Sequence, residues 1–143
     1  MKSFILTSFT LCSLVFCSFS CSKPDSKENC PEDLFCTEVF VSIGISVRDS
    51  NGKDVLLSKV VSTIQSSGIT YTYIPELPQS QNLYTIINDL QLKNLQKSGS
   101  EVIVEGFVKN AEKDVLFFTE KYTIGHDCCH VIKIEGKDVI VIK

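Results

Sequence analysis

The chain has 143 residues, of which 43% are hydrophobic and 22% charged, so it contains enough apolar residues to bury one ordinary core and is not typical of a disordered protein. Its 17 acidic and 14 basic residues give a net charge of -3, which does not favour binding to nucleic acid. We therefore expect one folded domain with no nucleic acid partner.

The first segment, "MKSFILTSFTLCSLVFCSFSC", has a lysine, then an uncharged apolar run, then small residues just before Cys21. This order is typical of a secretory signal peptide. The apolar run of about sixteen residues would form a helix of roughly 24 Å, shorter than the ~30 Å hydrocarbon core of a bilayer, so a retained transmembrane helix is less favoured. Residues 1–20 are predicted to be removed.

The stretch "SFSC" and the polar "SKPDSKEN" after it resemble the lipobox and tether of a bacterial lipoprotein, in the looser form found in Bacteroidota, with Ser18 where Leu is usual. The resemblance implies that acyl chains on Cys21 hold residues 21–35, a lipidated cysteine and a flexible tether, to the outer membrane. The domain would then face the periplasm or the cell exterior. Ser18 and Ser20 also suit the ordinary signal peptidase, which would release a soluble protein. Export is common to both alternatives.

The domain is expected to span residues 36–143. Its first stretch, "TEVFVSIGISVRD", alternates apolar residues from Val39 to Val47 with polar ones, which predicts a half-buried strand. Asn51 and Gly52 then supply the turn of a tight hairpin that returns the chain into "VLLSKVVSTI". The first two strands are therefore predicted to pair.

The middle of the chain contains two short strands and the one helix candidate. "GITYTYI" and "LYTII" are rich in β-branched and aromatic residues, and the loop between them contains two prolines. In "NDLQLKNLQKSGS", Asp89 is expected to cap a helix of about two turns and Gly99 to end it.

Two more hairpins are expected at the end of the chain. "EVIVEGFVKN" and "DVLFFTEKYTI" pair across "AEK", and "CHVIKI" and "DVIVIK" pair across Gly136 and Lys137. Short strands with frequent turns and one short helix predict an all-β fold, an antiparallel β-sandwich of about seven strands.

Four stretches of the domain resemble the transthyretin-like or carboxypeptidase-regulatory-like domains of small secreted lipoproteins. They are "CTEVFVSIGISVRDSNGKDV", "YTIINDLQLKNL", "EVIVEGFVKN" and "YTIGHDCCHVIKI". The resemblance implies an Ig-like β-sandwich, and it provides no established catalytic residues to transfer to this chain.

Of the seven cysteines, Cys12 and Cys17 leave with the signal peptide and Cys21 is the lipid site, which leaves four in the exported domain. Cysteines in an exported protein are expected to form disulfides. The adjacent pair in "GHDCCH" cannot bond to each other, because neighbouring Cα atoms lie about 3.8 Å apart. Two connectivities remain, and the alternation of the flanking strands weakly favours Cys36–Cys129 with Cys30–Cys128.

Two other interpretations of "GHDCCH" stay open. His126, Cys128, Cys129 and His130 are all legitimate zinc ligands, but four ligands so close together on an extended chain project to alternate faces and do not readily surround one ion. A redox centre would favour a Cys-x-x-Cys motif at the start of a helix. No cofactor is therefore expected.

The sequence contains no Ser-His-Asp, paired-carboxylate or glycine-rich phosphate pattern, so an enzyme is not expected. The carboxylates Glu101, Glu105, Asp114 and Glu120 fit a solvated surface. The tyrosines Tyr71, Tyr73, Tyr84 and Tyr122 fit a binding face or the core equally well. We expect a membrane-anchored, non-enzymatic binding or scaffold module, whose partners are the bilayer and an envelope protein or glycan. The alternative is a metal-binding or thiol-redox lipoprotein that uses His126, Cys128, Cys129 and His130.

Overall fold

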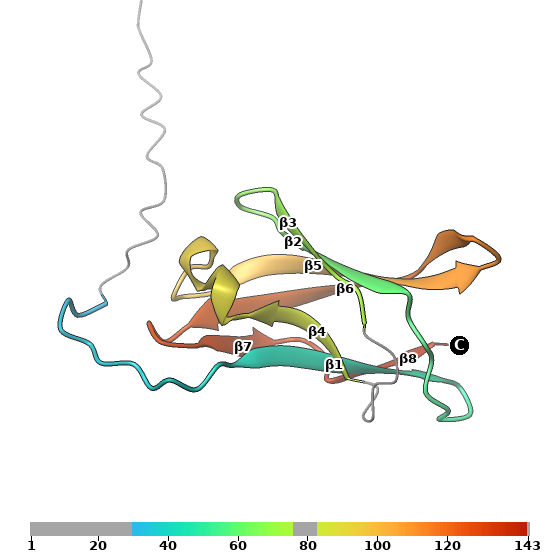
Figure 1. Cartoon of the computed structure of the whole chain (residues 1–143), viewed down its shortest axis with the longest axis horizontal. Helices are drawn as coiled ribbons and strands as arrows, with labels where there is room; N and C mark the ends of the chain where they lie inside the picture. Colours follow the sequence, from blue (N-terminus) through green and yellow to red (C-terminus); the bar gives the residue numbers. More distant parts are fainter. Residues whose placement is uncertain (1–29, 76–82, 143) are drawn as a thin grey trace, which may run out of the picture.

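A computed structural model describes residues 30–75 and 83–142 of the chain. The predicted signal peptide, Cys21 and the first part of the predicted tether lie outside these residues. Figure 1 shows two β-sheets that lie over each other. One short helix lies at the same end of the molecule as the N-terminal segment (residues 30–40). No helix in the described ranges has the length and apolarity needed to cross a bilayer.

The eight described strands divide into a three-stranded and a five-stranded sheet. The smaller has the order β4-β1-β8, with β1 and β8 parallel. The larger has the order β3-β2-β5-β6-β7 and is antiparallel throughout. The strands are β1 (Ser42–Asp49), β2 (Lys59–Ile64), β3 (Ile69–Tyr73), β4 (Leu83–Asn88), β5 (Ser100–Asn110), β6 (Lys113–His126), β7 (Val131–Glu135) and β8 (Val139–Ile142). The prediction of an all-β fold with two sheets is confirmed, but the prediction that all strands are antiparallel is wrong for β1 and β8.

The alternation of apolar residues places β1 as predicted, although the strand is shorter. Ile43, Ile45 and Val47 are buried between the sheets and contribute to a core supplied by both. The predicted strand began several residues earlier, but Val39 is largely exposed and the ladder begins only at Ser42. Just before β1, the N–H of Val41 donates to the carboxylate of Asp89 and not to a neighbouring strand.

The predicted pairing of the first two strands is wrong. The turn at Asn51 and Gly52 forms, with Gly52 at φ +79, but past the single bridge between Arg48 and Asp54 the chain crosses to the other sheet. There β2 pairs with β3 and β5. The hydroxyl of Tyr84 supports the crossing, because it donates to the carbonyl of Val55 at 2.8 Å and accepts from the N–H of Leu57 at 3.1 Å.

Of the two hairpins predicted at the end of the chain, one is confirmed and one is wrong. β5 pairs along its whole length with residues 113–124 of β6, around Ala111 and Glu112. β7 and β8 do not pair, since β7 extends the larger sheet beside β6 and β8 joins β1 in the smaller one. The crossing at Gly136 packs against the ring of Tyr122, which leaves no space for a side chain: a Cβ there would lie 2.1 Å from the ring.

The helix forms where predicted, but with another cap. It is a 3₁₀ helix, η1 (Asp89–Asn94), and its N-cap is Asn88, whose side chain accepts from the N–H of Leu90 at 3.0 Å. The side chain of Gln91 accepts from the N–H of Asn88 and completes a capping box. Gly99 has a positive φ of 113° but lies in a turn beyond the end of the helix. Asp89 is therefore left to interact elsewhere.

Candidate functional site

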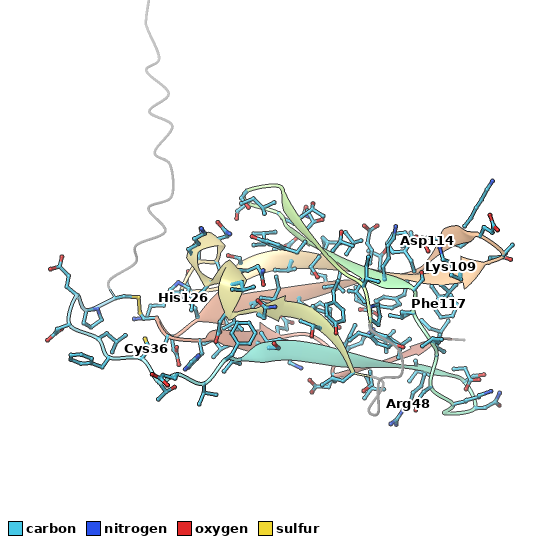
Figure 2. The ribbon with its side chains drawn as sticks, in the orientation of Figure 1. Cys36, Arg48, Lys109, Asp114, Phe117 and His126 are labelled. Carbon is cyan, nitrogen blue, oxygen red and sulfur yellow. A yellow bond between two sulfur atoms is a disulfide. The ribbon has the colours of Figure 1, made fainter. Side chains whose placement is uncertain are left out.

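Two disulfides join the N-terminal segment to the turn between β6 and β7, at the end of the sandwich where Cys36 and His126 lie (Figure 2). They are Cys30–Cys128 and Cys36–Cys129, with sequence separations of 98 and 93 residues. This is the predicted connectivity. The strand alternation used to choose this connectivity does not explain it, since Cys36 precedes β1 and Cys129 lies in a turn.

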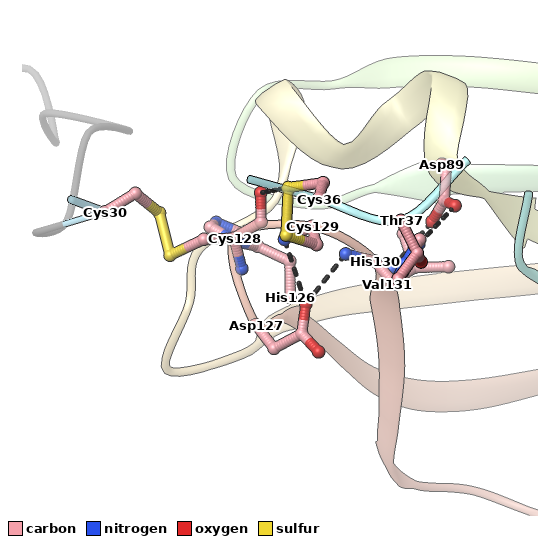
Figure 3. Close-up of a disulfide and its surroundings, with 10 residues drawn as sticks. All are labelled: Cys30, Cys36, Thr37, Asp89, His126, Asp127, Cys128, Cys129, His130 and Val131. Carbon is pink, nitrogen blue, oxygen red and sulfur yellow. Dashed lines mark hydrogen bonds and ion pairs between the residues drawn. A yellow bond between two sulfur atoms is a disulfide. The ribbon is translucent and has the colours of Figure 1, made fainter. Parts of the chain in front are cut away.

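The turn itself separates the two adjacent cysteines. Asp127 Oδ1 accepts from the N–H groups of Cys129 at 2.9 Å and His130 at 2.7 Å. The backbone of Cys128 has φ +85, a left-handed conformation that costs a non-glycine residue on the order of 1–3 kcal/mol. With the backbone turned in this way, the two sulfurs reach two different partners in the N-terminal segment (Figure 3). Hydrogen bonds from His130 and Cys129 hold the pKa of Asp127 below its ordinary value.

His126 is the last residue of β6 and its side chain is buried. Its Nδ1 accepts from the N–H of Cys128 at 3.1 Å, so in the neutral ring the proton is on Nε2. One ligand atom each of Cys30, His126 and Cys128 lie within 4.8 Å of one another. While the two cysteines are bonded together they provide no thiolate for a metal.

The ligand set of the alternative metal interpretation is not brought together among the described residues. Among the described residues, His126 lies with Cys30 and Cys128, whereas His130 interacts with Asp89 and Thr37. The sequence pattern predicted an extended chain through this stretch, whereas the structure has a turn there. The turn instead directs the two imidazoles to different partners.

Asp89 is the centre of a second, non-covalent junction. Its Oδ2 accepts from the N–H of Val41 at 2.8 Å. Oδ2 also lies 2.9 Å from His130 Nδ1, and Oδ1 accepts from the N–H of Val131 at 2.8 Å (Figure 3). His130 Nε2 lies 3.0 Å from Thr37 Oγ1. Burial raises the pKa of Asp89, but the hydrogen bonds from His130, Val41 and Val131 outweigh it, so the pKa lies below its ordinary value.

Asp89, His130 and Thr37 have the order and spacing of a nucleophilic triad, which the sequence did not reveal. A triad also needs free donors for the oxyanion. In this loop the N–H of Cys128 donates to His126, those of Cys129 and His130 donate to Asp127, and that of Val131 donates to Asp89. These four amides are already used, and the hydrogen bonds of Asp89 and His130 connect this loop to the residues just before β1.

Most of the other residues singled out in the sequence pack in or against the core or form ion pairs. Tyr84 and Tyr122 are in the core, and Tyr71 and Tyr73 pack against it. Asp114 lies 3.2 Å from both Lys59 and Lys109, at the other end of the sandwich from the cysteines (Figure 2). Hydrogen bonds from Ser58, Lys59 and Lys109 lower the pKa of Asp114 to about 2. Glu120 pairs with Lys137, and Glu101 with Lys121.

Comparisons of the chain with protein-family models, with curated proteins and with solved structures gave no match. The functional assignment therefore depends on the residues of this chain alone. Those residues form a double disulfide and a partly buried carboxylate that together fix the N-terminal segment to one end of the sandwich.

Proposed function

We propose that the chain is an exported lipoprotein, held to the outer membrane by acyl groups on Cys21, whose domain is a non-enzymatic binding or scaffold module of the cell envelope. The observation that carries the proposal is the state of the cysteines. All four in the described residues form disulfides, which persist in oxidising compartments outside the cytoplasm. Of the five cysteines in the predicted mature chain, this leaves Cys21 for the acyl groups.

The polar side chains around the two disulfides support the proposal of a non-enzymatic module, because they are used in hydrogen bonds within the domain. Thr37, Asp89, Asp127, His126 and His130 make hydrogen bonds that hold the backbone on both sides of the disulfides. The two-sheet architecture is compatible with the transthyretin-like resemblance, which we keep as part of the proposal.

A second candidate function has one observation in its favour. If Cys30–Cys128 were reduced, two thiols would lie within 4.8 Å of a nitrogen of His126, a set that suits a soft metal ion or a thiol-redox centre. This set differs from His126, Cys128, Cys129 and His130, the alternative that the sequence left open. It requires a reductant to act on a disulfide of the exported protein.

Intact mass of the protein extracted from membranes tests the main proposal. We expect a chain that begins at Cys21 with acyl groups attached, and Cys21→Ala should release the domain or stall its processing. An unmodified N-terminal cysteine would remove the lipid anchor from the proposal while leaving export in place. Thiol titration, with and without reductant, tests the alternative, because two free thiols in the exported protein would support the metal or redox function.

A further inference from the structure

The N-terminal segment (residues 30–40) carries large apolar side chains that do not join the core. Four of its residues are exposed although they are apolar: Leu34 (43%), Phe35 (96%), Val39 (65%) and Phe40 (57%). Figure 1 shows the segment running outside the two sheets at one end of the molecule. Single exposed apolar residues are ordinary, but several in one short segment indicate a contact surface.

The segment is held in this position by bonds at several points along it. Cys30 and Cys36 are bonded to Cys128 and Cys129, and Thr37 contacts His130. Just after the segment, the N–H of Val41 donates to Asp89. The backbone is therefore fixed against the polar turn between β6 and β7, while the phenyl rings of Phe35 and Phe40 stay exposed to solvent.

The position of Cys21 indicates what these side chains would contact. Cys30 lies nine positions after Cys21, and a chain of that length spans at most about 30 Å when fully extended. If Cys21 is acylated, the N-terminal segment stays within that distance of the bilayer surface. A single acyl chain gives only marginal membrane binding, so a second contact close to the anchor would strengthen it.

We propose that the N-terminal segment is a lipid-contact surface in which Phe35 and Phe40, with Leu34 and Val39, insert shallowly into the leaflet that holds the acyl chains of Cys21. This inference rests on the proposed lipidation. The segment contains Glu32, Asp33 and Glu38 and no lysine or arginine. Its contact is therefore apolar, with zwitterionic lipid preferred, and anionic lipid repels its carboxylates until salt screens them.

The chain contains no tryptophan, so one introduced indole reports on a single position. We would introduce it by Phe35→Trp in the acylated protein and reconstitute this variant in phosphatidylcholine vesicles with brominated acyl chains. The matched control is Leu116→Trp, an exposed position (49%) near the turn between β5 and β6 at the far end of the molecule. We expect several-fold stronger quenching of fluorescence in Phe35→Trp than in Leu116→Trp, and a shift of the Phe35→Trp emission to shorter wavelength.

Added phosphatidylglycerol should weaken the quenching of the Phe35→Trp variant at low salt, and salt should restore it. Equal, weak quenching of both variants in acylated protein that floats with the vesicles would overturn the lipid contact and favour a protein partner for the segment. Intact mass shows whether Cys21 is acylated, and so distinguishes loss of the lipid contact from absence of the lipid anchor. If no acyl group is found, the same two variants are titrated with vesicles in solution. On vesicle binding, Phe35→Trp should show a blue shift and quenching at least tenfold larger than those of Leu116→Trp, which would support the lipid-contact surface. Equal responses of the two variants would overturn it.

Discussion

His130 Nδ1 lies 2.9 Å from Asp89 Oδ2, although the two residues are 41 positions apart in the sequence. The same carboxylate accepts from the N–H groups of Val41 and Val131. One side chain at the start of η1 thus connects the beginning of β7 to the segment that precedes β1. The Asp89 carboxylate is mostly buried. If it were removed, its donors would lose their acceptor and water could not fully replace it.

Replacing this carboxylate should destabilise the protein clearly. Asp89→Asn keeps the volume of the side chain but leaves one acceptor oxygen for three donors, so we expect the free energy of unfolding to fall by about 1–3 kcal/mol. Urea denaturation measures the loss. The control is Asp54→Asn, which removes an exposed ion pair with Arg48 and should change stability by less than about 0.5 kcal/mol. Equal losses in the two variants would show that Asp89 does not hold the junction.

The lowered pKa of Asp89 also predicts a pH dependence. A carboxyl group whose pKa is lower in the folded state stabilises the protein fully above its unfolded value, near 3.8, and this stabilisation is lost as the pH falls through the folded value. Stability of the native protein should therefore decrease below about pH 4. In Asp89→Asn the decrease should be shallower, as thermal unfolding at a series of pH values would show. Identical slopes would contradict the assignment.

The disulfides should contribute more to stability than the histidines beside them. Each closes a loop of more than ninety residues, and loss of one such bridge typically costs about 2–5 kcal/mol. We expect the double variant Cys128→Ser, Cys129→Ser to lose much more stability than the double variant His126→Gln, His130→Gln. The histidine variant should still be measurably weaker than the native chain, because both imidazoles make hydrogen bonds. Non-reducing proteolysis should yield linked peptides from the two ends of the domain.

The two buried tyrosine hydroxyls should differ in importance. Tyr84 bridges Val55 and Leu57 where the chain crosses between sheets, whereas Tyr122 donates to one carbonyl, that of Lys137. Tyr84→Phe leaves two backbone groups without a partner and should cost about 1–3 kcal/mol. Tyr122→Phe should cost less, because the carbonyl of an exposed residue can bind water instead. A larger loss in Tyr122→Phe, measured by urea denaturation, would contradict this explanation of the crossing.

The positions of several strands could be predicted from the sequence, because they depend on neighbouring residues. Alternation of apolar residues located β1, because burial on one face of a strand repeats at every second residue. The hairpin of β5 and β6 was located by two strand-like stretches on either side of a short turn. The partner of each strand could not be read in this way. The turn at Asn51 and Gly52 forms as predicted, yet β2 joins the other sheet, where its buried residues Val60 and Ile64 complete the core.

The junction shows the same limit. The four cysteines of the predicted exported domain indicated two disulfides. Because the adjacent Cys128 and Cys129 cannot bond to each other, both bridges had to join the two ends of the domain. The role of Asp89 was missed because Asp89 and Asn88 are both suitable caps, and a shift of one residue decides which side chain is left free. Thr37, Asp89 and His130 carry no shared local signal, since only the fold brings them together.

The parallel pairing of β1 with β8 bears on how fast this domain can form. Ser46 pairs with Val139, so the ladder closes a loop about as long as that of Cys36–Cys129. Contacts between such distant segments form slowly, because the entropy of loop closure opposes them before any ladder bond is made. Once a disulfide has joined the two ends, that closure has already taken place. The oxidised chain should therefore refold faster than the reduced one, and β1 should spend less time as an open edge exposed to other chains.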